Sequence, residues 1–205
     1  MQTRLEKAID LSRQSYDVHS YLKNSVAGVI EENEDEVWFG FRGSYTLKSW
    51  IFNINLASGT YPYGNDNCSK VRIHQGFADA YKQARDIVLE SARGYKKVYL
   101  CGHSLGAAIA LVAAVDIQYN LKVVPEVYGF GCPNVGNKYW IASLNRRVPT
   151  VYLYRILTDP VPYLPFKFET QPRQQTSHRL FLNPHCIESY ATVLKATQNR
   201  ANIYI

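Results

Sequence analysis

The sequence predicts an α/β fold in which a central, mostly parallel sheet is covered by helices on both faces. Short apolar runs alternate with longer segments of helical periodicity, an order that joins parallel strands through crossover helices. Buried strands are expected at 98–101, 123–130 and 151–157. With 205 residues the chain can bury one large core, so residues 1–205 are expected to form a single domain.

The first part of the chain is expected to frame this sheet. Apolar side chains at helical spacing predict an amphipathic helix over about 3–20, with a scaffold role. Two strand-like runs at 26–30 and 37–41 flank the acidic segment 31–36, which is expected to be a solvated hairpin turn. Residues 57–69 are rich in turn-forming residues and predict an irregular loop.

Charge and hydropathy exclude several classes of partner. The net charge is +6, but the longest basic runs are Lys96-Lys97 and Arg146-Arg147, so we expect a solvated surface and no nucleic-acid site. Weak attraction to acidic membranes stays open. No apolar run approaches the roughly 18 residues of a transmembrane helix, and the first 21 residues lack a signal peptide pattern. The expected location is therefore cytoplasmic or soluble intracellular, with secretion of a trimmed form left open.

The cysteines do not indicate a metal site. Cys68, Cys101, Cys132 and Cys186 lie far apart, with no Cys-x-x-Cys and no histidine at metal-ligand spacing. Reduced thiols are expected, one disulfide stays possible, and no metal or other cofactor is predicted.

A nucleophile elbow is predicted at Gly102-His103-Ser104-Leu105-Gly106. It follows an apolar strand and precedes an apolar helix that extends to about Val115. Side chains at Gly102 or Gly106 would collide with the closely crossing chain, and the turn would present the Ser104 hydroxyl at a helix N-terminus. The alternative is a tight turn with an incidental serine.

A reactive serine needs a histidine base oriented by an acid, and proteins with this elbow have them in the order serine, acid, histidine. The aspartates after Ser104 are Asp116 and Asp159, and the histidines are His178 and His185. Asp116 would lie roughly 18 Å along the elbow helix, which is too far. Asp159 directly follows a predicted parallel strand and is favoured. His185 lies in a loop before the last helix and is favoured over His178, which is expected in or beside a short strand near 179–182.

His103 and His74 are expected to have structural rather than catalytic roles. His103 is expected to pack beneath the elbow, and His74 is expected to anchor the start of a helix. Three glutamates remain as less favoured acids: Glu126, Glu169 and Glu188.

A second loop and a short helix precede the elbow. A strand ends in Arg42-Gly43-Ser44, and Leu47, Trp50, Ile51 and Ile54 then follow at helical spacing. This helix is either part of the core or a flap over an apolar site.

Taken together, these motifs resemble the class 3 lipases, which are α/β-hydrolases that cleave acyl esters of glycerol. Five landmarks match in order: Phe41-Arg42-Gly43-Ser44, Val71 to Phe77, Gly102 to Gly106, Gly131 to Asn137, and Asp159-Pro160-Val161-Pro162. His185 followed by Tyr190 is similar to the family's ending, and the stretch from Asp159 to His185 is short for the family.

The resemblance implies roles for these residues. Ser104 would be the nucleophile, His185 the base and Asp159 its partner. Ser44 and the Leu105 amide would form the oxyanion hole. Residues 45–53, with Leu47, Trp50 and Ile51, would form a lid.

The expected function is hydrolysis of lipid carboxylic esters at a transient lipid–water interface, on acylglycerols or, as a phospholipase A, on phospholipids. Two alternatives remain: an esterase or thioesterase acting on soluble short-chain substrates, and a lipase-like binding or signalling module without turnover. The sequence does not predict the oligomeric state.

Overall fold

The computed structural model describes residues 2–17, 28–43, 58–60, 70–165, 168, 174–177 and 183–201. Its main sheet has the strand order β1-β2-β5-β6-β7-β8. Strand β1 is antiparallel to β2, and every other neighbouring pair is parallel, which confirms the predicted sheet. The strands of this sheet are β1 (Gly28–Glu32), β2 (Glu36–Phe41), β5 (Lys97–His103), β6 (Glu126–Phe130), β7 (Val151–Ile156) and β8 (Gln174–Ser177).

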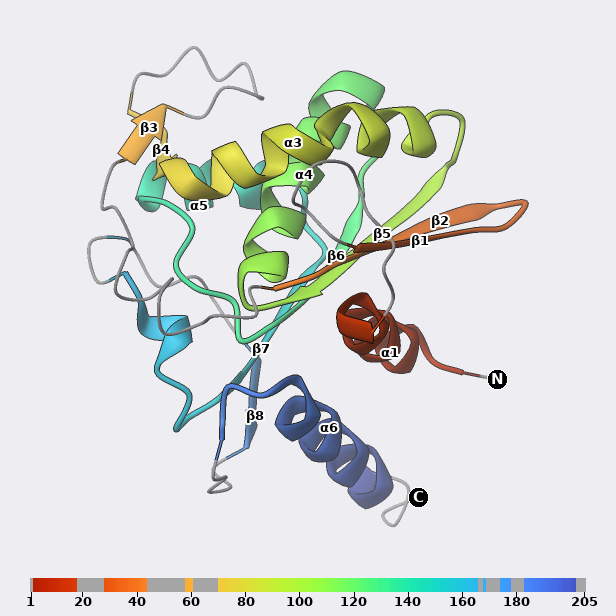
Figure 1. Cartoon of the computed structure of the whole chain (residues 1–205). Coiled ribbons are helices and arrows are strands. Elements are labelled where there is room, and N and C mark those ends of the chain that lie inside the picture. Colours follow the sequence, from red (N-terminus) through yellow and green to blue (C-terminus); the bar gives the residue numbers. More distant parts are fainter. Residues whose placement is uncertain are drawn as a thin grey trace.

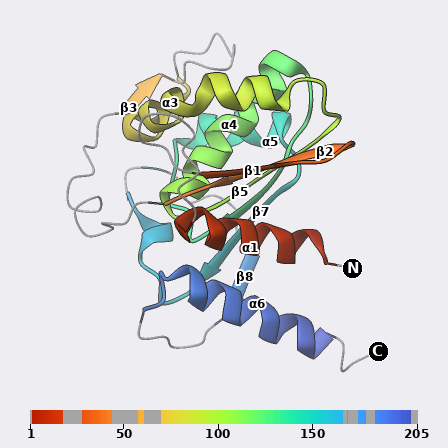
Figure 2. The same ribbon diagram turned by 45° about the vertical axis from the view of Figure 1, so that its right-hand side comes forward.

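Helices cover both faces of this sheet (Figure 1). Helices α3, α4 and α5 lie on one face, and α1 and α6 lie on the other, as the rotated view also shows (Figure 2). The helices are α1 (Arg4–Asp17), α3 (Gln75–Ala92), α4 (Leu105–Leu121), α5 (Lys138–Arg147) and α6 (Ile187–Ala201), with a 3-10 turn at Val161–Tyr163.

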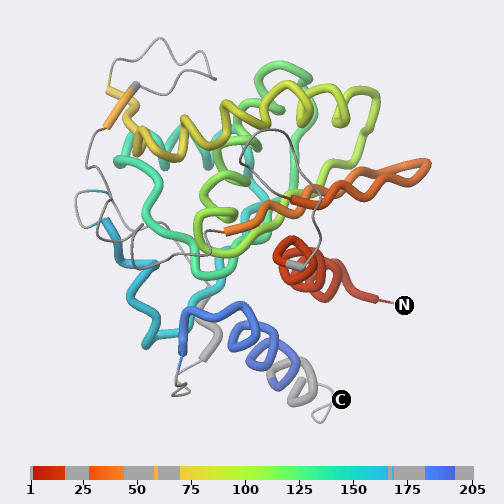
Figure 3. The backbone as a smooth tube through the Cα atoms, in the orientation of Figure 1, coloured from red at the N-terminus to blue at the C-terminus, as the bar shows by residue number. Residues whose placement is uncertain are grey.

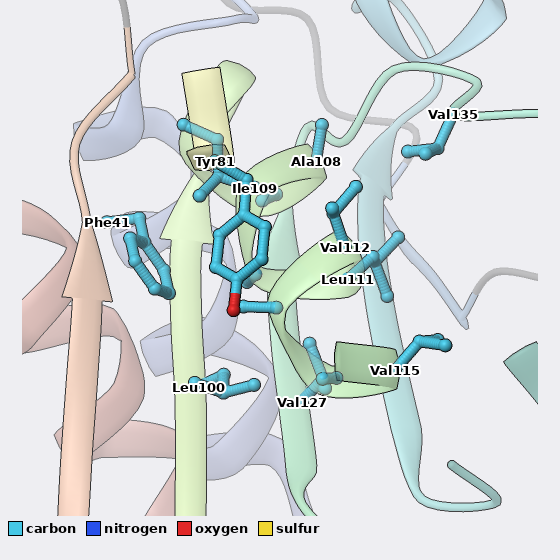
Figure 4. Packing of buried hydrophobic residues seen from close by; sticks show 14 of the residues in the cluster. Phe41, Tyr81, Leu100, Ala108, Ile109, Leu111, Val112, Val115, Val127 and Val135 are labelled. Carbon is cyan, nitrogen blue, oxygen red and sulfur yellow. The ribbon is translucent and has the colours of Figure 1, made fainter. Parts of the chain in front are cut away.

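Helix α4 is the centre of the larger core. Every residue from 106 to 117 is buried, because the helix lies between the sheet and α3. Its alanines allow close approach to the strands, and its larger side chains, such as Ile109, pack with Phe41 and Leu100 of β2 and β5 (Figure 4). The first turn of α4 is therefore held firmly against the ends of these two strands.

A smaller core joins α1 and α6 to the opposite face. Ala8, Ile9 and Leu11 of α1 are buried there, as are Tyr190 and Leu194 of α6. The two helices lie side by side in the backbone trace (Figure 3) and contact each other. Both ends of the described chain thus pack on one face of the sheet.

Some elements differ from those predicted. Ser58–Thr60 forms strand β3, which pairs with β4 (Arg72–His74), although 57–69 was expected to be an irregular loop. Strand β8 at Gln174–Ser177 was not predicted, and the short strand expected near 179–182 lies outside the described residues. Strand β1 continues through Glu32, so only the middle of the acidic segment is a turn. Among the helices described, none has the length and apolarity needed to cross a bilayer.

The buried acid Asp116 stabilises the packing of α3 on α4. Its carboxylate accepts hydrogen bonds from the Tyr81 hydroxyl at 2.7 Å, from Arg85 Nε at 2.8 Å and from Asn120 Nδ2 at 2.7 Å. Asp116 itself is fully buried. A carboxylate with three donors of this kind has a structural role.

We predict that Asp116→Ala lowers the free energy of unfolding by about 2–3 kcal/mol, because a buried carboxylate is removed from the Tyr81 hydroxyl, the Asn120 amide and the half-buried Arg85. Urea denaturation would measure this loss. Asp86→Ala, which removes an exposed carboxylate from α3, is the matched control and should change stability by less than about 0.5 kcal/mol. Similar losses in the two variants would contradict a structural role for Asp116.

Candidate active site

The turn between β5 and α4 holds Ser104 in strained backbone. Ser104 has φ 58° and ψ −124°, in the left-handed half of the Ramachandran plot that non-glycine residues rarely adopt. A Cβ at Gly102 would lie 2.5 Å from the Gly106 carbonyl carbon, and a Cβ at Gly106 would overlap the Phe41 carbonyl oxygen. Both glycines therefore permit close approach of the backbone, as expected for an elbow.

The start of α4 provides backbone N–H groups beside Ser104. The amides of Ala107 and Ala108 donate to the Ser104 carbonyl at 3.1 and 3.3 Å. The earlier amides of Leu105 and Gly106 have no acceptor within a helix that begins here. The positive end of the helix dipole adds to their field, so negative charge is favoured at this point.

Asp159 and His185 form a buried pair. His185 Nδ1 lies 2.7 Å from Asp159 Oδ2, and the exposed fractions are 6% for His185 and 0% for Asp159. Asp159 comes three residues after the end of β7, at the carboxyl edge of the sheet. His185 lies in the turn before α6, where the Cys186 amide and the Ser189 hydroxyl both donate to the Asn183 carbonyl.

Further hydrogen bonds orient the Asp159 carboxylate. The Val161 amide donates to Oδ1 at 2.9 Å, and the Tyr190 hydroxyl donates to Oδ2 at 2.6 Å. Gly131, with φ 60°, packs against the pair, and a Cβ there would lie 3.1 Å from Asp159 Oδ2 and from His185 Cε1. Both carboxylate oxygens are therefore fixed, and the carboxylate can hold the His185 ring in one orientation.

Three buried polar atoms of this site have no hydrogen-bond partner among the residues that the structure describes: Ser104 Oγ, His185 Nε2 and His103 Nε2. Buried polar atoms normally find a partner. Ser104 Oγ and His185 Nε2 are therefore free to bond to a substrate, and His185 has in addition a carboxylate that orients its ring.

A second histidine lies beside the first. The rings of His103 and His185 are 4.6 Å apart between centroids, and His103 Nδ1 lies 2.8 Å from the Tyr16 hydroxyl. Burial lowers the pKa of His103 well below its ordinary value, and the charge of a protonated His185 lowers it further, while the His185 backbone acts in the opposite sense. His103 is therefore a neutral ring.

Two of the alternative acids from the sequence lie in other contacts. Asp116 belongs to the ion pair with Arg85, and Glu126 interacts with Arg4 and with the Tyr128 hydroxyl. His74 caps α3 by accepting the Gly76 amide, as predicted. Ser44, Glu169, His178 and the lid residues Leu47, Trp50 and Ile51 lie outside the described residues, as does the expected lid segment 45–53.

The three cysteines that the structure describes have free thiols. Cys101, Cys132 and Cys186 carry thiols rather than disulfides, and Cys68 lies outside the described part. Burial raises the pKa of the Cys101 thiol to about 12, so it behaves as an apolar side chain. Within the described ranges, no group of histidine, cysteine and acidic side chains has a metal-binding arrangement.

Comparison with known proteins identifies the family. The model of the family "Lipase (class 3)" matches residues 38–169, which is more than half of the chain. The chain belongs to the class 3 lipases. The match includes the elbow and Asp159, and it ends before His185.

Known relatives agree with this family assignment. The secreted mono- and diacylglycerol lipase A of Penicillium cyclopium is 30% identical over 165 residues, covering 74% of this chain and 50% of that protein. A solved triacylglycerol lipase with a serine protease triad as its catalytic centre is 27% identical, with a TM-score of 0.60, over 74% of this chain and 60% of that chain. A triacylglycerol lipase from Penicillium expansum has a TM-score of 0.71 over 84% of this chain and 78% of its own, and its 18% identity shows the α/β-hydrolase fold alone.

The chain spans about half or less of the length of the curated class 3 relatives it matches. The expectation of a cytoplasmic or soluble intracellular location is wrong in the light of these relatives, because several of them are named as secreted lipases. The absence of a leader pattern in the first 21 residues was a poor guide to location.

Sequence reasoning missed three contributors to this class 3 site. The Val161 amide and the Gly131 backbone act through main-chain position, which no side-chain pattern reports. Tyr16 was assigned only to a scaffold helix, since helical periodicity predicts which face is buried and not what it contacts. Tyr190 could be picked out from the sequence, because a tyrosine after the histidine is part of the C-terminal pattern of the family.

We predict that His103 makes the fold sensitive to acid. Since its pKa is depressed in the native protein from an unfolded value of about 6.5, the unfolded chain binds a proton that the native state does not. Stability from this residue is therefore full above that value, and it falls below it by up to about 1.4 kcal/mol per pH unit. His103→Gln, which cannot be protonated, should have a flatter slope of unfolding free energy in urea titrations at pH values below about 6.5. Equal slopes for the variant and the wild type would contradict the prediction.

Proposed function

We propose that this protein is a serine hydrolase that cleaves carboxylic esters of lipids, with Ser104, His185 and Asp159 as its catalytic triad. The observation that supports this most is the buried His185–Asp159 pair, at 2.7 Å, in a chain that presents Ser104 on a strained elbow. The class 3 family and the lipase names of its relatives support the reaction type.

In the first half of the reaction the Ser104 oxygen attacks the ester carbonyl carbon. His185 Nε2 takes the hydroxyl proton, and the imidazolium that forms is stabilised by the Asp159 carboxylate on Nδ1. The tetrahedral intermediate collapses as the alcohol leaves with that proton from His185. Ser104 then carries the acyl group as an ester.

Water completes the second half in the same manner. His185 removes a proton from the water as its oxygen attacks the acyl carbon, and it returns the proton to Ser104 when the fatty acid leaves. The Leu105 amide, at the positive end of α4, and the Ser44 hydroxyl would stabilise the oxyanion in both steps. Residues 45–53, whose apolar residues are Leu47, Trp50 and Ile51, would form the lid.

The substrate class follows from the relatives and from the lid sequence. Relatives are named as mono- and diacylglycerol lipases and as triacylglycerol lipases, which supports acylglycerols as substrates. An apolar lid that opens would present a surface suited to a lipid–water interface. The secreted relatives support an extracellular site of action.

We predict that Ser104→Ala abolishes hydrolysis of acylglycerols and labelling by a fluorophosphonate probe. Loss of the nucleophile in such a triad lowers kcat by at least about 10³-fold. Initial rates on an emulsified monoacylglycerol and gel fluorescence would measure the two effects. Equal labelling of Ser104→Ala and wild type would disprove Ser104 as the nucleophile.

The same assays decide between the two candidate bases and between substrate classes. His185→Ala should lose activity, and the matched variant His178→Ala should retain it. The reverse result would assign the base to His178. A rate that does not rise when the substrate passes from monomers to aggregates would indicate a soluble short-chain ester instead of a lipid interface.

We predict that Gly131→Ala lowers kcat by about tenfold, because the methyl group would displace the Asp159 carboxylate and the His185 ring. Steady-state kinetics and thermal unfolding would be measured together. The matched control is Gly94→Ala, where φ is 92° but no heavy atom lies within 4 Å of the added Cβ. Both variants should lose about 1 kcal/mol of stability, and only Gly131→Ala should lose activity. An equal loss of kcat in both would show that backbone strain alone is responsible.

A further inference from the structure

The last turn of α1 lies against the elbow. Tyr16 lies on this turn, and its hydroxyl is 2.8 Å from Nδ1 of His103, which is the last residue of β5 and directly precedes Ser104. Tyr16 and His103 are 87 residues apart in sequence. Helix α1 thus contacts the active site as well as the sheet that it covers (Figure 2).

The Tyr16 hydroxyl also contacts the loop that follows β2. A Cβ at Gly43 would overlap this hydroxyl and would lie 2.7 Å from the His103 carbonyl oxygen and 3.2 Å from Ser104 Cβ. Gly43 directly precedes Ser44, the proposed oxyanion donor. One hydroxyl therefore touches the elbow strand and the loop that leads to Ser44.

His103 also contacts His185, the proposed base. Its ring packs on the His185 ring at 4.6 Å with an interplanar angle of 38°, and it lies 5.9 Å from the Tyr190 ring. The Tyr16 hydroxyl on Nδ1 restrains the rotation of the His103 ring, and the His185 backbone is the other hydrogen-bonding group beside that ring.

We propose that Tyr16 is a positioning residue for catalysis, which orients the neutral His103 ring so that this ring holds His185 in place. The inference rests on the proposed function, because it assigns to Tyr16 and His103 a role in the action of His185. Neither residue exchanges a proton with the substrate in this proposal. Their contribution is geometric.

The reaction explains why such a support matters. His185 gains and loses a positive charge twice per turnover, while its Nδ1 must stay on Asp159 and its Nε2 must reach Ser104 and the leaving group. Asp159 fixes one edge of the ring, but one hydrogen bond leaves the ring free to tilt about it. A neutral aromatic ring against one face limits that tilt and does not repel the charged form.

If Tyr16 had a purely structural role, removing its hydroxyl would change stability but not turnover. Helix α1 is anchored by its buried residues Ala8, Ile9 and Leu11, which do not depend on the Tyr16 hydroxyl. Tyr99 is a suitable comparison, because it is a buried tyrosine of β5 in the same small core and lies away from the triad. Tyr16→Phe should cost somewhat more stability than Tyr99→Phe, because it also removes a hydrogen bond, and only Tyr16 should affect turnover.

The test compares Tyr16→Phe with Tyr99→Phe on a monomeric p-nitrophenyl ester, so that binding to an interface plays no part. Tyr16→Phe should lower kcat by about fivefold at unchanged KM, as expected for the loss of one positioning hydrogen bond, and Tyr99→Phe should leave both constants as in the wild type. Thermal unfolding should show both variants folded at the assay temperature, so that the loss of kcat is not a loss of folded protein. In a His103→Leu background, adding Tyr16→Phe should cause no further loss of kcat, because Tyr16 acts through His103.

Other results would contradict either this inference alone or the proposed function as well. Wild-type kcat in Tyr16→Phe, an equal loss in Tyr99→Phe, or additive losses in the double variant would overturn this inference while the hydrolase function stands. A wild-type protein that neither hydrolyses the ester nor is labelled at Ser104 by a fluorophosphonate would overturn the proposed function, and this inference with it.

Discussion

The close approach of three backbone segments at the elbow is the constraint on which the whole site depends. Gly102 touches the Gly106 carbonyl, Gly106 touches the Phe41 carbonyl, and Gly43 lies against Ser104. Because no side chain fits at these contacts, β2, β5 and α4 come nearer than ordinary packing allows. The strain in the Ser104 backbone, of about 1–3 kcal/mol, is maintained by the burial of α4 in the larger core.

The two faces of the sheet hold different parts of the site. Ser104 depends on α4 and the larger core, whereas His185 depends on the turn before α6 and on the smaller core beneath α1. Asp159 comes from the carboxyl end of β7, at the edge where both faces meet, and a parallel sheet collects loops at this edge. The relative position of Ser104, Asp159 and His185 is therefore a consequence of packing on both sides at once, and neither core alone fixes it.

The sequence predicted those parts of the fold and site that have a local signal. The glycine spacing around Ser104, the position of Asp159 after a buried strand and the loop position of His185 could each be read from a few neighbouring residues. Contacts between distant segments had no such signal, which is why the pairing of Tyr16 with His103 was missed. Strands β3 and β8 were missed because three or four mostly polar residues become a strand only through the neighbour with which they pair.

Two buried histidines lie side by side here, and their partners distinguish them. His185 Nδ1 meets the Asp159 carboxylate, which is fixed by two further donors. His103 meets a neutral phenol, and its burial is not compensated by any opposite charge among the described residues. The two rings lie 4.6 Å apart between centroids, so a neutral His103 ring brings no second positive charge beside His185. The same side chain is therefore proposed as the base at one position and as a neutral support at the other, and the partner of Nδ1 distinguishes the two rings.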